Sequence, residues 1–191
     1  MPTVPAKCTE CGGILQVDKG KDAAVCSHCN TPFIIEKAIN NYIGISGQSD
    51  FEIRAGELIK YNGSAVDVVI PDNVTYIGSG AFRDCRGLKT VIIPNVIISI
   101  GEYAFYGCLN LTNIIIPDSV AVIEKYAFYG CAHLTDIRLP EGIVSVEKGL
   151  FSKCSALTRI IIPDKVTSIG ESAFVACSSL ISITIPANVN F

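Results

Sequence analysis

Nine cysteines carry most of the potential chemistry of this 191-residue chain, and they fall into two sets with different spacing. Four of them form two close pairs near the N-terminus, each pair with two residues between its members. A turn of this kind lets both thiolates bind one metal ion, and two such turns complete the closed tetrahedral site that zinc prefers. We therefore predict a structural zinc site whose ligands are Cys8, Cys11, Cys26 and Cys29.

Two other interpretations of these pairs stay open. His28 lies inside the second pair and is an alternative ligand, although four cysteines already fill a tetrahedral site. A C-x-x-C pair also serves as a redox dithiol, but that chemistry occurs in a strand–helix unit, and this segment has no such pattern. The structural metal site is the better interpretation.

The segment around the cysteines has the pattern of a small β domain. Short strands are expected at residues 14–17 and 23–25, with a turn at residues 18–22 between them. From Lys7 to about Ile35 the chain resembles the zinc ribbon family. The resemblance implies an N-terminal β zinc ribbon, and because so short a segment has little core, the metal would supply much of its folding energy.

Residues 1–40 form the first predicted domain. A short helix is expected at residues 33–42, and a polar, glycine-containing linker at residues 41–50. The four lysines and four acids of residues 1–40 balance, and Phe33 is their only aromatic residue. Nucleic acid binding needs a cationic stripe or an aromatic platform, so nucleic acid is not favoured as a partner. A nucleic-acid-linked regulator that contacts DNA or RNA through the ribbon is the alternative function.

The other five cysteines recur every 23 residues, and so do five phenylalanines and six prolines. A spacing kept without insertion over about 120 residues indicates a solenoid, in which each coil buries its apolar face against its neighbours. The coils read L-x-x-I-x-I-P-x-x-x-V-x-x-I-G-x-x-A-F-x-x-C-x. The periodic residues are Cys85, Cys108, Cys131, Cys154 and Cys177; Phe82, Phe105, Phe128, Phe151 and Phe174; and Pro71, Pro94, Pro117, Pro140, Pro163 and Pro186.

Each coil is expected to begin with a strand that turns alternate residues inward, such as Ile114 and Ile116. Stacked coils would then form one continuous parallel β-ladder, and Pro117 and its equivalents would end each strand because proline donates no ladder hydrogen bond. The A-F-x-x-C segment is expected to form a tight helical turn on the opposite side. The predicted fold class is therefore an α/β repeat solenoid with a parallel β-ladder.

From Asp67 to the C-terminus the motif I-P-x-x-V-x-x-I-G-x-x-A-F-x-x-C-x-x-L resembles the BspA-type, or Treponema pallidum-type, leucine-rich repeats. The resemblance implies a right-handed leucine-rich repeat arc that binds proteins or surface ligands, and many members of the family are secreted adhesins. The solenoid is expected over residues 51–191, with a capping hairpin at 51–64, five full repeats at 65–179 and a partial repeat at 180–191.

Two sets of surface residues are candidates for partner binding. On the concave ladder, isoleucines alternate with the buried residues and are flanked by charges that are expected to form cross-strand ion pairs. The competing interpretation is that β-branched residues there only stabilise the sheet. Four tyrosines in adjacent coils form the second set, on the outer side, as a contact surface or as packing between coils. The candidates are Ile92, Asn113, Ile115, Asp136, Arg138, Arg159 and Ile161, and Tyr103, Tyr106, Tyr126 and Tyr129.

The remaining features favour a non-catalytic protein. No phosphate-binding glycine loop or nucleophile motif occurs, and His28 and His133 are the only histidines. The five periodic cysteines are expected to be buried free thiols. The last strand, in residues 180–186, is expected to leave an open edge that supports a homodimer, unless the chain was cut short.

Charge and hydropathy bound the location. The net charge is −3, which does not favour general attraction to nucleic acid or to anionic membranes. The first seven residues have no apolar signal segment, so a cytoplasmic protein is expected, with an unknown protein as its partner. A surface adhesin, exported by an unrecognised route, is a further alternative.

Overall fold

The structure is a computed structural model that describes residues 3–7, 14–18, 23–25, 32–34 and 50–189. The chain divides into two compact units, residues 1–47 and residues 48–191. Each unit is described by itself. Among the described residues, no helix is long and apolar enough to cross a membrane.

The N-terminal unit contains two antiparallel pairs of strands. β1 (Thr3–Lys7) pairs with β2 (Ile14–Asp18), and β3 (Ala23–Val25) pairs with β4 (Pro32–Ile34). Strands were therefore expected correctly near residues 14–17 and 23–25, but in the described residues the two belong to different sheets rather than to one hairpin. The predicted helix is wrong at its first two residues, because Phe33 and Ile34 pair with Ala24 and Ala23 in a β-ladder.

Each C-x-x-C pair lies, by sequence, in the connection between two paired strands. Cys8 and Cys11 connect β1 to β2, and Cys26 and Cys29 connect β3 to β4. The four cysteines themselves, His28 and the predicted linker up to residue 49 lie outside the described residues.

The solenoid begins with a hairpin that closes the first coil. β5 (Phe51–Arg54) and β6 (Glu57–Tyr61) pair antiparallel, and β6 then pairs in parallel with β8 (Tyr76–Ile77). Leu58 and Tyr61 are buried against the first coil, so the hairpin covers core that would otherwise face water.

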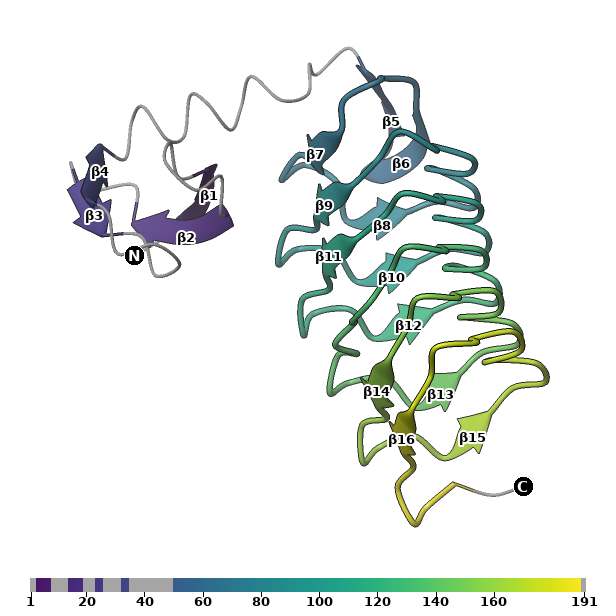
Figure 1. Cartoon of the computed structure of the whole chain (residues 1–191). Coiled ribbons are helices and arrows are strands. Elements are labelled where there is room, and N and C mark those ends of the chain that lie inside the picture. The colour runs from purple at the N-terminus through teal and green to yellow at the C-terminus, as the bar shows by residue number, and fades with distance from the viewer. Residues whose placement is uncertain (1–2, 8–13, 19–22, 26–31, 35–49, 190–191) are drawn as a thin grey trace. The chain divides into compact units, whose positions relative to one another are not determined.

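Two parallel ladders run along the solenoid, and equivalent residues in adjacent strands are 23 apart (Figure 1). The first ladder, which was expected, contains β7 (Asp67–Val69), β9 (Thr90–Ile92), β11 (Asn113–Ile115), β14 (Arg159–Ile161) and β16 (Ser182–Thr184). The second contains β8, β10 (Ser99–Ile100), β12 (Val122–Ile123), β13 (Ser145–Val146) and β15 (Ser168–Ile169).

Both ladders are interrupted at the fourth coil, residues 134–156, so the prediction of one continuous ladder is wrong. Strands β7, β9 and β11 form one sheet and β14 and β16 another, and the second ladder divides between β12 and β13. On the turn side the coils stay joined, since the Phe128 N–H donates to the Leu150 carbonyl and the Gly130 N–H to that of Ser152. The third and fourth coils thus separate at the ladders only.

The core is a column of stacked phenylalanines lined by aliphatic side chains. Neighbouring rings from Phe82 to Phe174 lie 5.0 to 5.8 Å apart and nearly parallel, and the first four are fully buried. The inward direction predicted for Ile114 and Ile116 is confirmed, because both are buried. Dispersion and hydrophobic contact between adjacent coils therefore supply most of the cohesion.

The cysteines of the five repeats are free thiols in the structure. Those of the three central coils are fully buried, and each donates to a carbonyl of the preceding coil. Burial raises the pKa of all three thiols above their ordinary value. They therefore act as small apolar residues with one internal hydrogen bond.

The A-F-x-x-C segments form turns rather than the helical turn that we expected. Two positions in each coil have a positive φ, which a right-handed helix does not allow. One position contains Gly80, Tyr103, Tyr126, Gly149 and Ser172, and the other contains Asp84, Gly107, Gly130, Lys153 and Ala176. The described residues contain no α-helix, so this unit is a β-solenoid rather than an α/β one.

Candidate functional site

The outward residues of the first ladder form the main candidate surface, which we call the strand face. Side chains alternate along a strand, so the residue between two buried isoleucines faces outward. Ile115 is 55% exposed and Ile161 is 69% exposed. Ile92 is only 5% exposed, which corrects our expectation for this residue. It lies in the central strand of three, with β-branched Val69 and Ile115 at matching positions on either side.

Charged side chains of the fourth coil connect it to both neighbours. The expected ion pair between Asp136 and Arg159 is present, with 3.3 Å between the carboxylate and the guanidinium. Arg138 instead contacts Asp118 at 3.2 Å and Glu141 at 3.6 Å. These pairs are exposed, so each contributes little to stability and they mainly hold the side chains in place.

Asp118 has a further role at the junction of the third and fourth coils. Its carboxylate accepts a hydrogen bond from the Glu141 N–H at 3.3 Å as well as one from Arg138. These two contacts, the backbone one first, lower the pKa of Asp118 below its ordinary value. The carboxylate therefore stays ionised and spans the junction at neutral pH.

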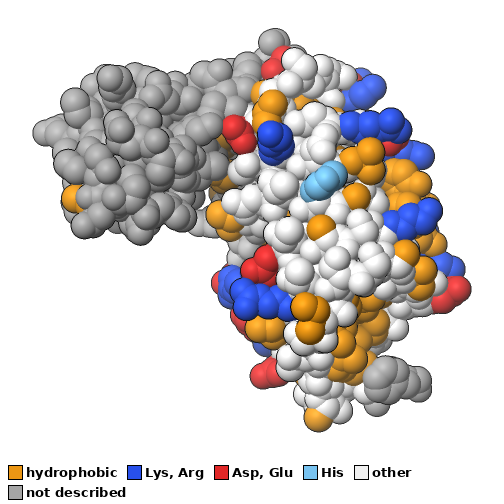
Figure 2. Space-filling model, viewed as in Figure 1, with side chains coloured by type: hydrophobic (Ala, Val, Ile, Leu, Met, Phe, Trp, Pro, Cys, Tyr) orange, Lys and Arg blue, Asp and Glu red, His pale blue; other side chains and the backbone are white. Residues whose placement is uncertain are grey.

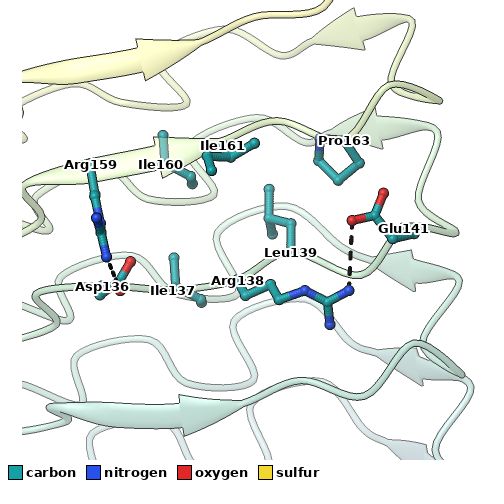
Figure 3. Close-up of a pocket in the computed structure, with 9 residues that line it drawn as sticks. All are labelled: Asp136, Ile137, Arg138, Leu139, Glu141, Arg159, Ile160, Ile161 and Pro163. Carbon is teal, nitrogen blue, oxygen red and sulfur yellow. Dashed lines mark hydrogen bonds and ion pairs between the residues drawn. The ribbon is translucent and has the colours of Figure 1, made fainter.

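A pocket of about 310 Å³ lies between the fourth-coil segment and β14 (Figure 3). The Asp136–Arg159 pair closes one end and the Arg138–Glu141 contact lies at the other, as the figure shows. The middle is apolar, lined by Ile137, Leu139, Ile160, Ile161 and Pro163. An apolar centre between polar ends suits a side chain of a partner protein.

The four tyrosines lie together on the turn side. Tyr103 stacks on Tyr126 at 5.2 Å and Tyr106 on Tyr129 at 4.8 Å, with all four half-buried. The Arg83 guanidinium lies 5.0 Å from the ring of Tyr106, and the Lys153 ammonium lies 5.1 Å from the ring of Tyr129. Because ring faces are covered by other rings and cations, the cluster offers mainly ring edges to a partner.

Figure 2 shows that lysines and arginines gather along this turn side among hydrophobic side chains. Most of these cations have an acidic neighbour, as in the Lys125–Glu102 and Lys148–Glu171 pairs at 3.3 and 2.6 Å. His133 is exposed, and its Nδ1 lies 2.8 Å from the Leu109 carbonyl oxygen.

Several residues of these surfaces were not predicted from the sequence. Asp118 and Glu141 each directly follow one of the periodic prolines, Pro117 and Pro140, and this shared position was a usable signal. Arg83 and Lys153 left no such signal, because turn geometry places them over the rings. Within the described residues, no group of three or more histidine, cysteine or acidic side chains could hold a metal ion.

Stacked coils with a parallel ladder, an apolar interior and an exposed strand face define the class of leucine-rich repeat solenoids. The BspA type leucine rich repeat region matches residues 59–154 and 98–191, with six copies, so the chain belongs to this family. No curated protein matched the chain.

Solved structures agree with this family. The T. pallidum leucine rich repeat protein is 30% identical, with a TM-score of 0.71, and the match covers 74% of this chain and 71% of that one. A leucine rich cell surface protein from Faecalibacterium prausnitzii is 37% identical, with a TM-score of 0.61 and a match that covers 66% of this chain and 34% of that one. The pneumococcal vaccine antigen PcpA, 21% identical, shares the fold, with a TM-score of 0.59 over 73% of this chain and 39% of the antigen.

Proposed function

We propose that this chain is a non-catalytic scaffold whose strand face binds a partner protein. The observation that carries the proposal is the exposure of Ile115 and Ile161 on either side of the fourth coil, where charged residues frame an apolar pocket. Exposed apolar side chains with a polar rim are typical of a protein-binding surface. Asn113, Asp136, Arg138 and Arg159 supply that rim.

The test is affinity capture with the full chain and a double variant, Ile115→Glu with Ile161→Glu. The matched control is Val122→Glu with Val144→Glu, because these residues are 49% and 58% exposed and lie along the second ladder. We expect the strand-face variant to lose its partners and the control to keep them. Equal capture by both variants would contradict the strand face as the binding surface.

The tyrosine cluster is proposed as a second contact region. Tyrosine is enriched among residues that dominate binding energy, and stacking holds these rings in place. Replacing Tyr106 and Tyr129 with phenylalanine keeps the stack and removes two hydroxyls. A several-fold loss of affinity would support contact through these edges, whereas unchanged affinity would assign the cluster to packing between coils.

We also propose that the N-terminal unit is a zinc ribbon held by Cys8, Cys11, Cys26 and Cys29. The support is that each cysteine pair lies in the connection of an antiparallel strand pair, where two thiolates can reach one ion. Elemental analysis of purified protein should give one zinc per chain. Cys11→Ser with Cys29→Ser should lose it, and the control Cys131→Ser should retain it; a metal-free wild-type protein would contradict the site.

A second copy of the chain is proposed as a partner for β16. Within residues 50–189 the outer edge of β16 has no paired strand, and Ile181 beside it is 88% exposed. Sedimentation equilibrium should show a dimer that Ile181→Lys weakens. A monomer mass at every concentration would remove this proposal.

Location is the remaining choice between a cytoplasmic scaffold and a surface adhesin. Thiolate zinc ligands favour the reducing cytoplasm, which we propose. The adhesin alternative is supported by the 37% identical relative that is described as a cell surface protein. Cell fractionation separates the two.

A further inference from the structure

An opening lies beside β11, where no strand of the fourth coil pairs with it within residues 50–189. It has a volume of about 560 Å³ and is lined by residues 112–116 of the third coil and 135–138 of the fourth. At the bottom of Figure 3 the fourth-coil segment runs above β11 without being a strand itself. The opening is thus bordered on one side by a regular strand edge.

Backbone groups of β11 face this opening without partners. In a parallel strand, successive residues direct their N–H and C=O groups to opposite neighbours. The Asn113 N–H donates to the Lys89 carbonyl, so Asn113 and Ile115 bond to the second coil, and Ile114 and Ile116 face the fourth. At the equivalent position of other coils, the Ile70 N–H donates to the Ile92 carbonyl and the Ile162 N–H to the Thr184 carbonyl, both at 3.1 Å, whereas within residues 50–189 Ile93 and Leu139 have no such acceptor. Within residues 50–189, Ile116 has no such acceptor in the fourth coil.

The shape and charge of the opening restrict what can fill it. Unpaired donors and acceptors at strand spacing are complementary to another extended backbone. The lining contains one acid, Asp136, and one base, Arg138, and both already have ion-pair partners. The net charge of the lining is zero, so an uncharged segment suits it better than an acidic or basic one.

We propose that an extended, uncharged segment of a partner protein adds to the free edge of β11 as a new strand. Side chains of an added strand align with those of its neighbour, so the segment places apolar residues over Ile114 and Ile116 and β-branched residues beside Ile115. This inference rests on the proposed protein-binding function and names the mode of binding at that face.

The first measurement is amide hydrogen exchange in the full-length protein. The amides of Ile114 and Ile116 exchange faster than those of Val91 and Ile162, because Val91 lies in a strand that pairs with β11 and the Ile162 N–H donates to the Thr184 carbonyl. Equal protection of the two pairs of amides would overturn the proposal, since the edge would then not be free.

The second measurement adds an uncharged probe, the N-acetylated and amidated peptide with the sequence of residues 90–94, Thr-Val-Ile-Ile-Pro. At about 1 mM it slows exchange of the Ile114 and Ile116 amides about ten-fold. In a parallel arrangement, N-methylation at the peptide's Thr and first Ile abolishes the effect, and methylation at Val does not. Unchanged exchange with the parent peptide would overturn the proposal.

Glu147→Gly is the matched protein variant, because residue 147 does not line the opening. This variant alters the second ladder and leaves the lining of the opening unchanged, so the peptide keeps its effect on it, and loss of the effect would overturn the assignment to the edge of β11. If partner capture depends on Ile115 and Ile161 but the peptide has no effect on exchange, the scaffold function is supported and strand addition is rejected. If the Ile115→Glu, Ile161→Glu variant keeps its partners and still responds to the peptide, the strand face is rejected as the binding surface.

Discussion

Glu124 and Glu147 occupy the same position in adjacent coils, and within residues 50–189 the Glu147 N–H donates no hydrogen bond to the preceding coil. At the neighbouring junctions one or both residues are glycine, and the later amide donates to the preceding coil: Gly101 to Ile77 at 2.8 Å, Glu124 to Ile100 at 2.9 Å and Gly170 to Val146 at 2.7 Å. A Cβ at Gly101 would lie 2.8 Å from the Ser79 nitrogen, so coils approach closely here. Two glutamates add bulk and like charge to that contact, which accounts for the interruption of the second ladder.

Replacing Glu147 with glycine should restore the ladder between β12 and β13. We expect the free energy of unfolding to rise by about 1 kcal/mol, because regained backbone hydrogen bonds exceed the entropic cost of glycine. Urea unfolding and exchange of the residue 147 amide measure the change. Glu147→Gln keeps the bulk and removes the charge, so an equal effect of Gln would assign the interruption to repulsion. An unprotected amide in the glycine variant would contradict the account.

The phenylalanine column should lose stability in proportion to burial. Phe128 is fully buried between two other rings, so Phe128→Ala should cost about 3–5 kcal/mol. Phe174 stacks on a ring at one side and is only half-buried, so Phe174→Ala should cost less. Chemical denaturation of the two variants gives the comparison, and equal losses would show that the column is not the main source of cohesion.

Replacing Ala176 with glycine should stabilise the protein. Its φ is 58°, and the equivalent residues Gly107 and Gly130 have φ values of 69° and 72°. The left-handed conformation costs a residue with a Cβ about 1–2 kcal/mol, and part of this gain is lost to the greater unfolded-state entropy of glycine. Ala176→Gly should therefore stabilise by about 0.5–1 kcal/mol in thermal unfolding. Ala127→Gly is the control, since Ala127 is buried at a position without positive φ, and it should destabilise.

Stability should fall at alkaline pH because of the buried thiols. Burial raises the pKa of Cys108, Cys131 and Cys154 above the ordinary value of 9.0. Thiols whose folded pKa exceeds the unfolded one stabilise fully below about pH 9 and lose that contribution as pH rises toward the folded pKa. Unfolding midpoints in urea should therefore decline above pH 9, and Cys131→Ala should decline less steeply. Alkylation at pH 8 should label the half-buried Cys85 and Cys177 before the central three.

Much of the solenoid was predictable because its pattern is periodic. The 23-residue spacing of proline, phenylalanine and cysteine indicated stacked coils, and alternation around Ile114 and Ile116 indicated which side chains are buried. The second ladder and the non-helical turns were not predicted. Their signal is weaker, because strands of two residues show no alternation, and a non-glycine residue such as Tyr103 gives no warning of a positive φ.

The sequence by itself determined the repeat, the inward columns and the outward direction of Ile115 and Ile161, since these depend on spacing along one chain. The tertiary structure decided where the ladders stop, which partners Arg138 takes and that Ile92 is covered. Those outcomes depend on residues that meet across adjacent coils. At the junction of Glu124 and Glu147, bulk and charge oppose strand pairing, while the turns of the same two coils stay hydrogen-bonded. Only the folded chain shows that repulsion prevails at the ladder and hydrogen bonding at the turns.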